Sequence, residues 1–294
     1  MEKKKREVVI LDVDGVLNSY SNRRFYMKFI VRSLRELSKV HGRKKLFKEL
    51  VGIKKYGGAK GFFVFAKKYC GNDEKYRVFC FNLVNGLDYD CISYDPVMKK
   101  MMHRLSSIGN ICIRSDGLGD IAKAAWMRVV ENKSSREIKQ ELNRMRIGQS
   151  GKKVKLCGKK VWFSGIEDNE FRLKKDKNSW KLFSEKYLVD VEKSVLLDDS
   201  RTNLDVAKSL GMTTVHISVM DSFLSKSTGV SIFGHSLSDV LGKNLSKTIE
   251  DYRISYGKKV DVKTLFGNIL AEDAKAEEKS LEILKKGAFY SCRF

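Results

Sequence analysis

Two aspartates, Asp12 and Asp14, follow the apolar run at 8–11 and are well placed to do chemistry. Four residues that favour strands, followed by two carboxylates and Gly15, predict a buried strand with both aspartates at its carboxyl end. In open α/β sheets, ligands bind at that edge. Charged side chains seldom stand beside a core strand unless they are paired or hold a metal. The stretch therefore indicates an α/β fold together with a metal or phosphate site.

Similar strand ends recur further along the chain. The run at 111–113 leads to Ser115, and the run at 195–197 leads to Asp198 and Asp199. Because the carboxyl ends of parallel strands share one edge of a sheet, these side chains can meet the first aspartate pair. Four carboxylates in one crevice repel one another without a cation, and Mg²⁺ takes carboxylate oxygens and pairs with phosphate. We therefore expect Mg²⁺ as the cofactor.

The elements that position these residues alternate between apolar runs and helical periodicity. This alternation predicts βαβ units and a Rossmann-like parallel sheet with helices on both faces. Residues 19–92 interrupt it with amphipathic helical spacing. The chain is expected to divide into an α/β core at 1–18 and 93–234, a helical region at 19–92, a basic insertion within the core at 131–160, and a helical C-terminal extension at 235–294.

The composition limits the partners. The 294 residues carry a net charge of +22, and such charge attracts phosphorylated metabolites, nucleic acid or anionic membranes. The lysines are spread along the whole chain, which favours a Lys-rich surface over a dedicated site. No apolar run is long enough to cross a bilayer or to serve as a signal peptide, so a cytoplasmic protein is expected. The six cysteines lack metal-ligand spacing and are expected to be reduced thiols.

Three motifs, in order, resemble those of the haloacid dehalogenase-like (HAD) superfamily. Residues 12–17, Asp-Val-Asp-Gly-Val-Leu, resemble its first motif, 111–115 its second, and 195–200 its fourth. The resemblance covers roughly 8–217. It implies a Rossmann-like core and identifies the insertion at 19–92 as a helical cap that closes over the site.

The resemblance also implies a role for each of these residues in phosphoryl transfer. Asp12 would be the nucleophile that forms an aspartyl-phosphate, and Asp14 would protonate the leaving oxygen and later deprotonate the attacking water. Ser115 would hold an oxygen of the transferring phosphoryl group. The implied metal ligands are Asp12, Asp14 through its backbone carbonyl, Asp198 and Asp199, with Asn203 supporting them from the following helix.

The third motif of the family is a lysine that neutralises the phosphorylated intermediate and holds the substrate phosphate. The resemblance places it best on Lys177, because Phe183 stands six residues later, where the family commonly has phenylalanine. Asn178 replaces the usual proline, so Lys174 and Lys175 stay open as alternatives.

Asp14 separates the reaction types of the family, since dehalogenases attack carbon and do not need this second acid. The expected function is a Mg²⁺-dependent phosphomonoesterase acting on a small phosphorylated metabolite, such as a nucleotide or sugar phosphate, with a phosphomutase left open. One alternative is a nucleic-acid-associated protein or polynucleotide end phosphatase that uses the basic surface, although no nucleic-acid-binding signature is present. Another is a catalytically reduced family member that binds a partner as a scaffold. Substrate and oligomeric state stay open.

Overall fold

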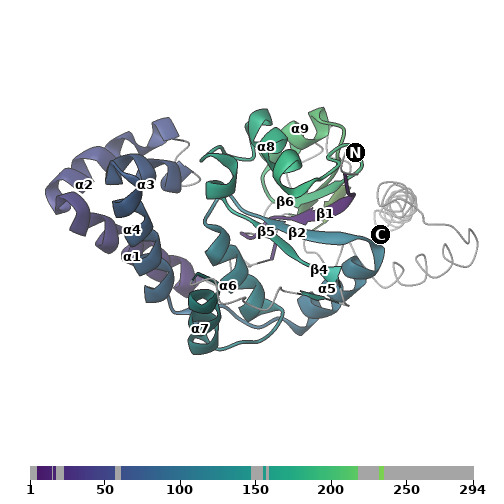
Figure 1. Ribbon diagram of the computed structural model, residues 1–294, viewed down its shortest axis with the longest axis horizontal. Coiled ribbons are helices and arrows are strands. Elements are labelled where there is room, and N and C mark those ends of the chain that lie inside the picture. The colour runs from purple at the N-terminus through teal and green to yellow at the C-terminus, as the bar shows by residue number, and fades with distance from the viewer. Residues whose placement is uncertain are drawn as a thin grey trace, which may run out of the picture.

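A six-stranded parallel sheet lies at the centre of the computed structural model (Figure 1). The structure describes residues 5–14, 16–17, 23–56, 61–146, 155–156, 159–217 and 232–234. In spatial order the strands are β5 (Trp162–Ser164), β2 (Asn110–Arg114), β1 (Val8–Leu11), β6 (Val195–Asp198), β7 (Thr213–Ile217) and β8 (Ile232–Gly234). Val9 of β1 pairs with Ile111 of β2 and Val195 of β6. The chain moves outward in opposite directions from β1 and β6, so a topological switch point lies between them.

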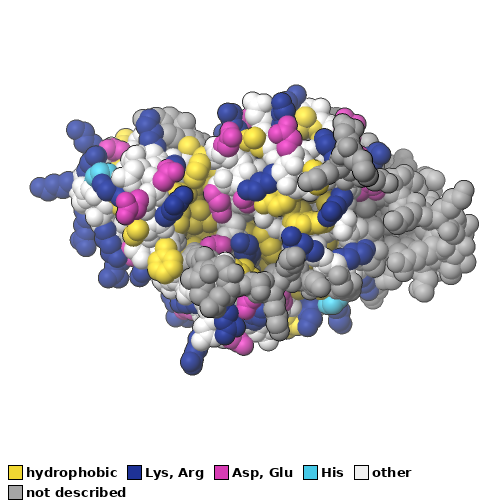
Figure 2. Space-filling view, in the orientation of Figure 1, with side chains coloured by type: hydrophobic (Ala, Val, Ile, Leu, Met, Phe, Trp, Pro, Cys, Tyr) yellow, Lys and Arg dark blue, Asp and Glu magenta, His cyan; other side chains and the backbone are white. Residues whose placement is uncertain are grey.

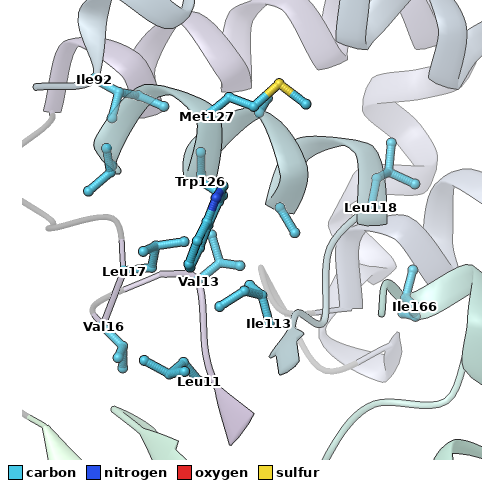
Figure 3. Packing of buried hydrophobic residues seen from close by; sticks show 14 of the residues in the cluster. Leu11, Val13, Val16, Leu17, Ile92, Ile113, Leu118, Trp126, Met127 and Ile166 are labelled. Carbon is cyan, nitrogen blue, oxygen red and sulfur yellow. The ribbon is translucent and has the colours of Figure 1, made fainter. Parts of the chain in front are cut away.

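Helices cover both faces of the sheet, which is why β1 is apolar at every position. Val8 and Ile10 pack toward α8 (Lys177–Tyr187) and α9 (Arg201–Ser209). The alternate residues of β1 face the cluster that includes α5 (Pro96–Ile108) and α6 (Gly119–Val129). Figure 3 shows Trp126 pointing from α6 toward Val13 and Leu17, just beyond the end of β1. The core therefore packs against the segment that carries Asp12 and Asp14 and holds it in place.

A helical region, which lies between β1 and β2 in the sequence, stands beside the core (Figure 1). It consists of α1 (Arg23–His41), α2 (Arg43–Leu50), η1 (Val51–Tyr56), α3 (Phe62–Cys70), α4 (Asp73–Gly86) and η3 (Tyr89–Cys91). Local signals set the boundary between α3 and α4. Gly71 follows α3 with φ 78°, a conformation that favours glycine, and the Asn72 side chain accepts a hydrogen bond from Lys75 N to cap α4. The described residues of the predicted insertion at 19–92 are thus almost entirely helical.

The segment at 131–160, predicted as a basic insertion, contains a helix, α7 (Ser135–Arg146). The Ser134 and Glu137 side chains cap its start reciprocally, since Ser134 N donates to Glu137 Oε2 over 2.8 Å and Glu137 N donates to Ser134 Oγ. Ile138 and Leu142, one turn apart, are buried in the core. The many charged residues of this segment make the narrow apolar stripe difficult to recognise in the sequence. Two short antiparallel strands, β3 (Lys155–Leu156) and β4 (Lys159–Lys160), complete the described part of the segment.

The Lys and Arg side chains are scattered over the face seen in Figure 2 and are densest over the helical region at its left end. None of the helices in the described ranges combines the length and apolar character needed to cross a membrane. The predicted C-terminal extension at 235–294 lies outside the described residues.

Candidate active site

The carboxyl ends of β1, β2 and β6 bring the predicted side chains to one edge of the sheet. Asp12 and Ser115 each directly follow their strands, and Asp198 is the last residue of β6. A cavity of about 290 Å³ opens above them. Its lining residues from the core are Asp12, Asp14, Ser115, Asp116, Gly117, Asp199 and Asn203.

Three carboxylates cluster at this end of the cavity. Oxygens of Asp12, Asp198 and Asp199 all lie within 4.8 Å of one another. Asp12 is 8% exposed and Asp198 is fully buried. Burial raises the pKa of Asp12 well above its ordinary value, and the negative charge of Asp198 raises it further. Carboxylate oxygens at this spacing repel one another, and a divalent cation such as Mg²⁺, which prefers such oxygen ligands, would reduce that repulsion.

Lys174 is the cation of the site. Its Nζ lies 2.8 Å from Asp12 Oδ1 and 2.6 Å from Asp198 Oδ2, and the side chain is 1% exposed. Burial alone would lower the pKa of Lys174, but the charges of the two aspartates outweigh it and raise the pKa, which keeps the ammonium protonated. The backbone of Lys174 is held on both sides. Its N–H donates to Asp116 Oδ1 over 2.8 Å, and its carbonyl accepts from Trp180 Nε1 over 2.7 Å.

The structure does not bring Lys177, the lysine favoured from the sequence, to the site. Lys177 is exposed at the first position of α8. The Asp176 side chain caps this helix by accepting from Asn178 N over 2.9 Å, so the helix starts at the surface. Phe183 is buried away from the site, in the apolar cluster on the face of the sheet that α8 and α9 cover. The spacing to Phe183 therefore located the helix, whereas the inward-facing lysine lies in the loop before it.

Asp14 lies at the cavity wall, where a tyrosine of the helical region reaches it. Tyr26 Oη on α1 donates a hydrogen bond to Asp14 Oδ1 over 2.9 Å. Burial raises the pKa of Asp14, while the hydrogen bond from Tyr26 acts in the opposite direction and is the smaller effect. Sequence reasoning missed Tyr26, because nothing in the spacing of α1 shows that this ring faces the core.

Ser115 lies in a tight turn at the end of β2. Its Oγ accepts a hydrogen bond from Gly117 N over 2.9 Å, and its N–H donates to Ser164 O of the neighbouring strand over 2.9 Å. A Cβ on Gly117 would lie 3.2 Å from Ser115 Oγ and 3.5 Å from Cε2 of Phe63. A glycine here therefore keeps the cavity open at the serine.

Asp198 receives several donors besides the lysine. Asn203 Nδ2 lies 3.2 Å from each oxygen of Asp198, and Ser200 N donates to Oδ1 over 2.8 Å. Asn203 thus supports the acidic cluster from α9, where the sequence placed it. The neighbouring Asp199 is only half-buried, and its carbonyl accepts from His216 Nε2 over 3.0 Å. Asp198 is held in place by protein donors, whereas the Asp199 carboxylate faces the cavity.

The sequence matches no protein-family model, and no curated protein matches it. Several solved structures are similar to the chain at low identity. A HAD phosphatase from Thermococcus onnurineus is 17% identical with a TM-score of 0.48, over 86% of this chain and 100% of that one. CbbY from Rhodobacter sphaeroides, in complex with phosphate, is 16% identical with a TM-score of 0.44, over 81% and 96%. A 2-haloacid dehalogenase from Pseudomonas syringae is 14% identical with a TM-score of 0.43, over 84% and 99%.

The similar structures thus include a phosphatase and a dehalogenase. The fold is carried by the topology. The neighbouring strands β2, β1 and β6 lead into the residues of the second, first and fourth motifs, and the helical region follows the first motif in the sequence. The described part of the chain therefore has a doubly wound α/β fold with a helical insertion after the first strand, which is the architecture that the resemblance to the haloacid dehalogenase-like superfamily implies.

Proposed function

We propose that this protein is a Mg²⁺-dependent phosphomonoesterase that works through an aspartyl-phosphate on Asp12. The observation that carries the proposal is the pairing of two carboxylates with different surroundings. Burial raises the pKa of both, but Asp12 is held by an ion pair to Lys174, whereas Asp14 lies at the cavity wall and accepts a hydrogen bond from Tyr26. Two neighbouring carboxyl groups in different environments are suited to nucleophilic and acid–base roles respectively.

In the first step Asp12 attacks the phosphorus of the ester. The N–H of Val13 and Lys174 Nζ both contact Oδ1 of Asp12, so Oδ2 is the attacking oxygen. The new Oδ2–P bond forms as the bond from phosphorus to the ester oxygen breaks, and Asp14 gives its proton to that leaving oxygen. Ser115 Oγ binds an oxygen of the transferred group. Lys174 offsets the negative charge that builds up around Asp12.

In the second step water releases the phosphate. Asp14, now ionised, takes a proton from a water molecule as that water attacks phosphorus. The bond between phosphorus and Asp12 Oδ2 breaks, which frees inorganic phosphate and returns both aspartates to their starting states. One acid thus serves both halves of the cycle. A dehalogenase-type reaction, with attack on carbon, would leave Asp14 without this task.

The acidic cluster of Asp12, Asp198 and Asp199 would hold the Mg²⁺. Asp198 already accepts from Lys174 and Asn203, so Asp199 and Asp12 have more capacity to ligate it directly. When bound, the ion supplies positive charge that reduces the repulsion between the nucleophile and the phosphate dianion.

Removal of divalent cations tests the proposal. With Mg²⁺ the protein should release inorganic phosphate from a panel containing phenyl phosphate, a nucleoside monophosphate and a sugar phosphate. EDTA should reduce the rate by about 100-fold or more, since a metal ion contributes several kcal/mol to such a transition state, and excess Mg²⁺ should restore it. Turnover that is indifferent to EDTA would contradict the proposed metal site. Absence of turnover on every ester would favour a partner-binding scaffold.

A thermal-shift measurement supplies the control for this experiment. Mg²⁺ at about 100 times its Kd should stabilise the wild type by about 2.7 kcal/mol, because it binds only the folded state. Asp199→Asn should lose most of this shift. Asp205→Asn removes an exposed carboxylate from α9, away from the cavity lining, and should keep it.

Asp14→Asn should lower kcat by about 10²–10⁴-fold, the usual contribution of a general acid–base group. Asparagine keeps the shape of the side chain and can still accept from Tyr26, so substrate affinity should change by no more than about threefold. Steady-state rates with direct binding of a phosphonate analogue separate the two quantities. A variant that loses affinity but keeps kcat would rule out the acid–base role.

A further inference from the structure

We propose that the substrate is a monophosphate ester whose leaving group is flat, uncharged and largely apolar, such as an aryl or heteroaromatic group. The proposal rests on the phosphomonoesterase function above and names its substrate class. It is carried by the part of the cavity lining that the helical region supplies, which consists of four aromatic side chains: Tyr26, Phe29, Phe62 and Phe63.

Two helices supply these rings. Tyr26 and Phe29 are three residues apart on α1 and therefore share a face of that helix. Phe62 and Phe63 occupy the first turn of α3. The centroid of the Phe29 ring lies 6.2 Å from that of Phe62 and 6.1 Å from that of Phe63, and the last two centroids are 5.3 Å apart. These tilted and edge-to-face contacts hold the three phenylalanine rings together, and with Tyr26 they make up the aromatic wall of the cavity.

The aromatic wall lies close to the phosphate end of the site. Cε2 of Phe63 comes within 3.5 Å of the position that a Cβ on Gly117 would take, in the turn that follows Ser115. Tyr26 reaches Asp14, the group that protonates the leaving oxygen, over 2.9 Å. A phosphate ester bound at Asp12 would therefore place the rest of its leaving group against these rings.

The charges of the lining restrict this leaving group further. Among the described residues that line the cavity are four aspartates and no lysine or arginine. A second phosphate or a carboxylate on the leaving group would face these acidic residues, with no lysine or arginine among the described lining residues to neutralise it. A sugar placed against the three phenylalanines would lose hydration of its hydroxyl groups on that side, because these rings offer no hydrogen bonds in return. A flat apolar group suits both constraints, because ring stacking requires neither charge nor hydrogen bonds.

The size of the cavity is consistent with a small ester. Ligand pockets usually range over about 300–1,000 Å³, and this one, at about 290 Å³, is at the lower end. It has room for a phosphate and a leaving group of one or two rings. A polynucleotide end would extend well beyond the described lining.

The test compares two phosphonates, which cannot be hydrolysed, in the presence of Mg²⁺. Calorimetry should give phenylphosphonate an affinity about tenfold or more above that of methylphosphonate, since stacking of a ring on an aromatic side chain commonly contributes that much. In Phe29→Leu and Phe62→Leu the ratio should fall to about threefold or less, while the affinity for methylphosphonate stays unchanged. Hydrolysis should follow the same order, with kcat/KM for phenyl phosphate above that for glycerol phosphate.

Phe25→Leu is the matched control. Phe25 is a buried ring on α1 beside Tyr26, but it does not line the cavity, so this variant should keep the preference for the aryl ligand. Circular dichroism and Tm verify that each variant is folded.

The outcomes separate this inference from the proposed function. Mg²⁺-dependent hydrolysis without an aryl preference, or a preference that survives both variants, would overturn the inference and leave the phosphatase intact. A preference that depends on Phe29 and Phe62, without hydrolysis of any ester, would support the aromatic subsite and reject the phosphatase. If neither phosphonate binds and no ester is hydrolysed, both are wrong.

Discussion

Lys174→Met is expected to lower kcat/KM by about 10²–10³-fold and the free energy of unfolding by about 3–5 kcal/mol in the absence of divalent cations. The ammonium of Lys174 is buried between the carboxylates of Asp12 and Asp198, at 2.8 and 2.6 Å. Methionine has a similar length but no charge, so both carboxylates would be left buried without their cation. Urea unfolding in EDTA measures the stability, and phosphate release with Mg²⁺ measures the activity.

Lys177→Met is the matched control, because it removes the same charge three residues away at an exposed position. It should leave the free energy of unfolding within about 0.5 kcal/mol of the wild type, as surface substitutions usually do, and kcat/KM should change by no more than the same free energy. If Lys177→Met is inactive while Lys174→Met is active, the lysine favoured by the sequence is the functional one and the geometry of this site is wrong. Lys174→Arg keeps the charge and should recover much of the stability, which separates loss of charge from loss of packing.

Asp12→Asn should reduce kcat by about 10⁴-fold or more, because a nucleophile that forms a covalent intermediate cannot be replaced by a neutral amide. The same substitution removes a buried carboxylate and should therefore stabilise the protein at pH 7 in EDTA. A gain of about 1 kcal/mol in the free energy of unfolding corresponds to a rise in Tm of about 2–4 °C. Scanning calorimetry and phosphate release measure the two effects on one preparation.

Asp12→Asn is expected to lower activity but raise stability. The gain in stability follows from the pKa of Asp12, which burial and the charge of Asp198 raise in the folded state. A raised pKa means that stability is greatest below the pKa of the unfolded chain and falls as the pH rises through the pKa of the folded chain. Ionisation of Asp12 in the folded protein therefore costs folding free energy, and asparagine avoids that cost. A variant that is both inactive and strongly destabilised would show that Asp12 has a structural role instead.

The strands that carry the site could be predicted because each is apolar at successive positions and ends in a polar residue. Residues 8–11 and 195–197 are buried on both faces of the sheet, so they form continuous apolar runs of the kind found in central parallel strands. Asn203 could also be placed, because α9 starts directly after β6 and carries it one turn in. These features depend on local sequence and on the general geometry of parallel sheets.

The lysine and the aromatic wall depend on contacts that local sequence does not contain. Lysines at 174, 175 and 177 are chemically equivalent, and the choice among them depends on Asp116, whose carboxylate holds the Lys174 backbone across 58 positions of sequence. Helical periodicity likewise indicates that α1 has an apolar face, but it does not say that Tyr26 on that helix stands over Asp14. Tertiary packing decides both cases.

The proposed mechanism requires Asp12 to carry the phosphoryl group during turnover. Acid quenching of the wild type with Mg²⁺ and excess phenyl phosphate while phosphate is being released, followed by proteolysis and mass spectrometry, tests this requirement. We expect a peptide containing Asp12 that carries one phosphoryl group, and no such peptide from Asp12→Asn. Steady phosphate release with the Asp12 peptide unmodified at every quench time, or with the phosphoryl group on another residue, would contradict it.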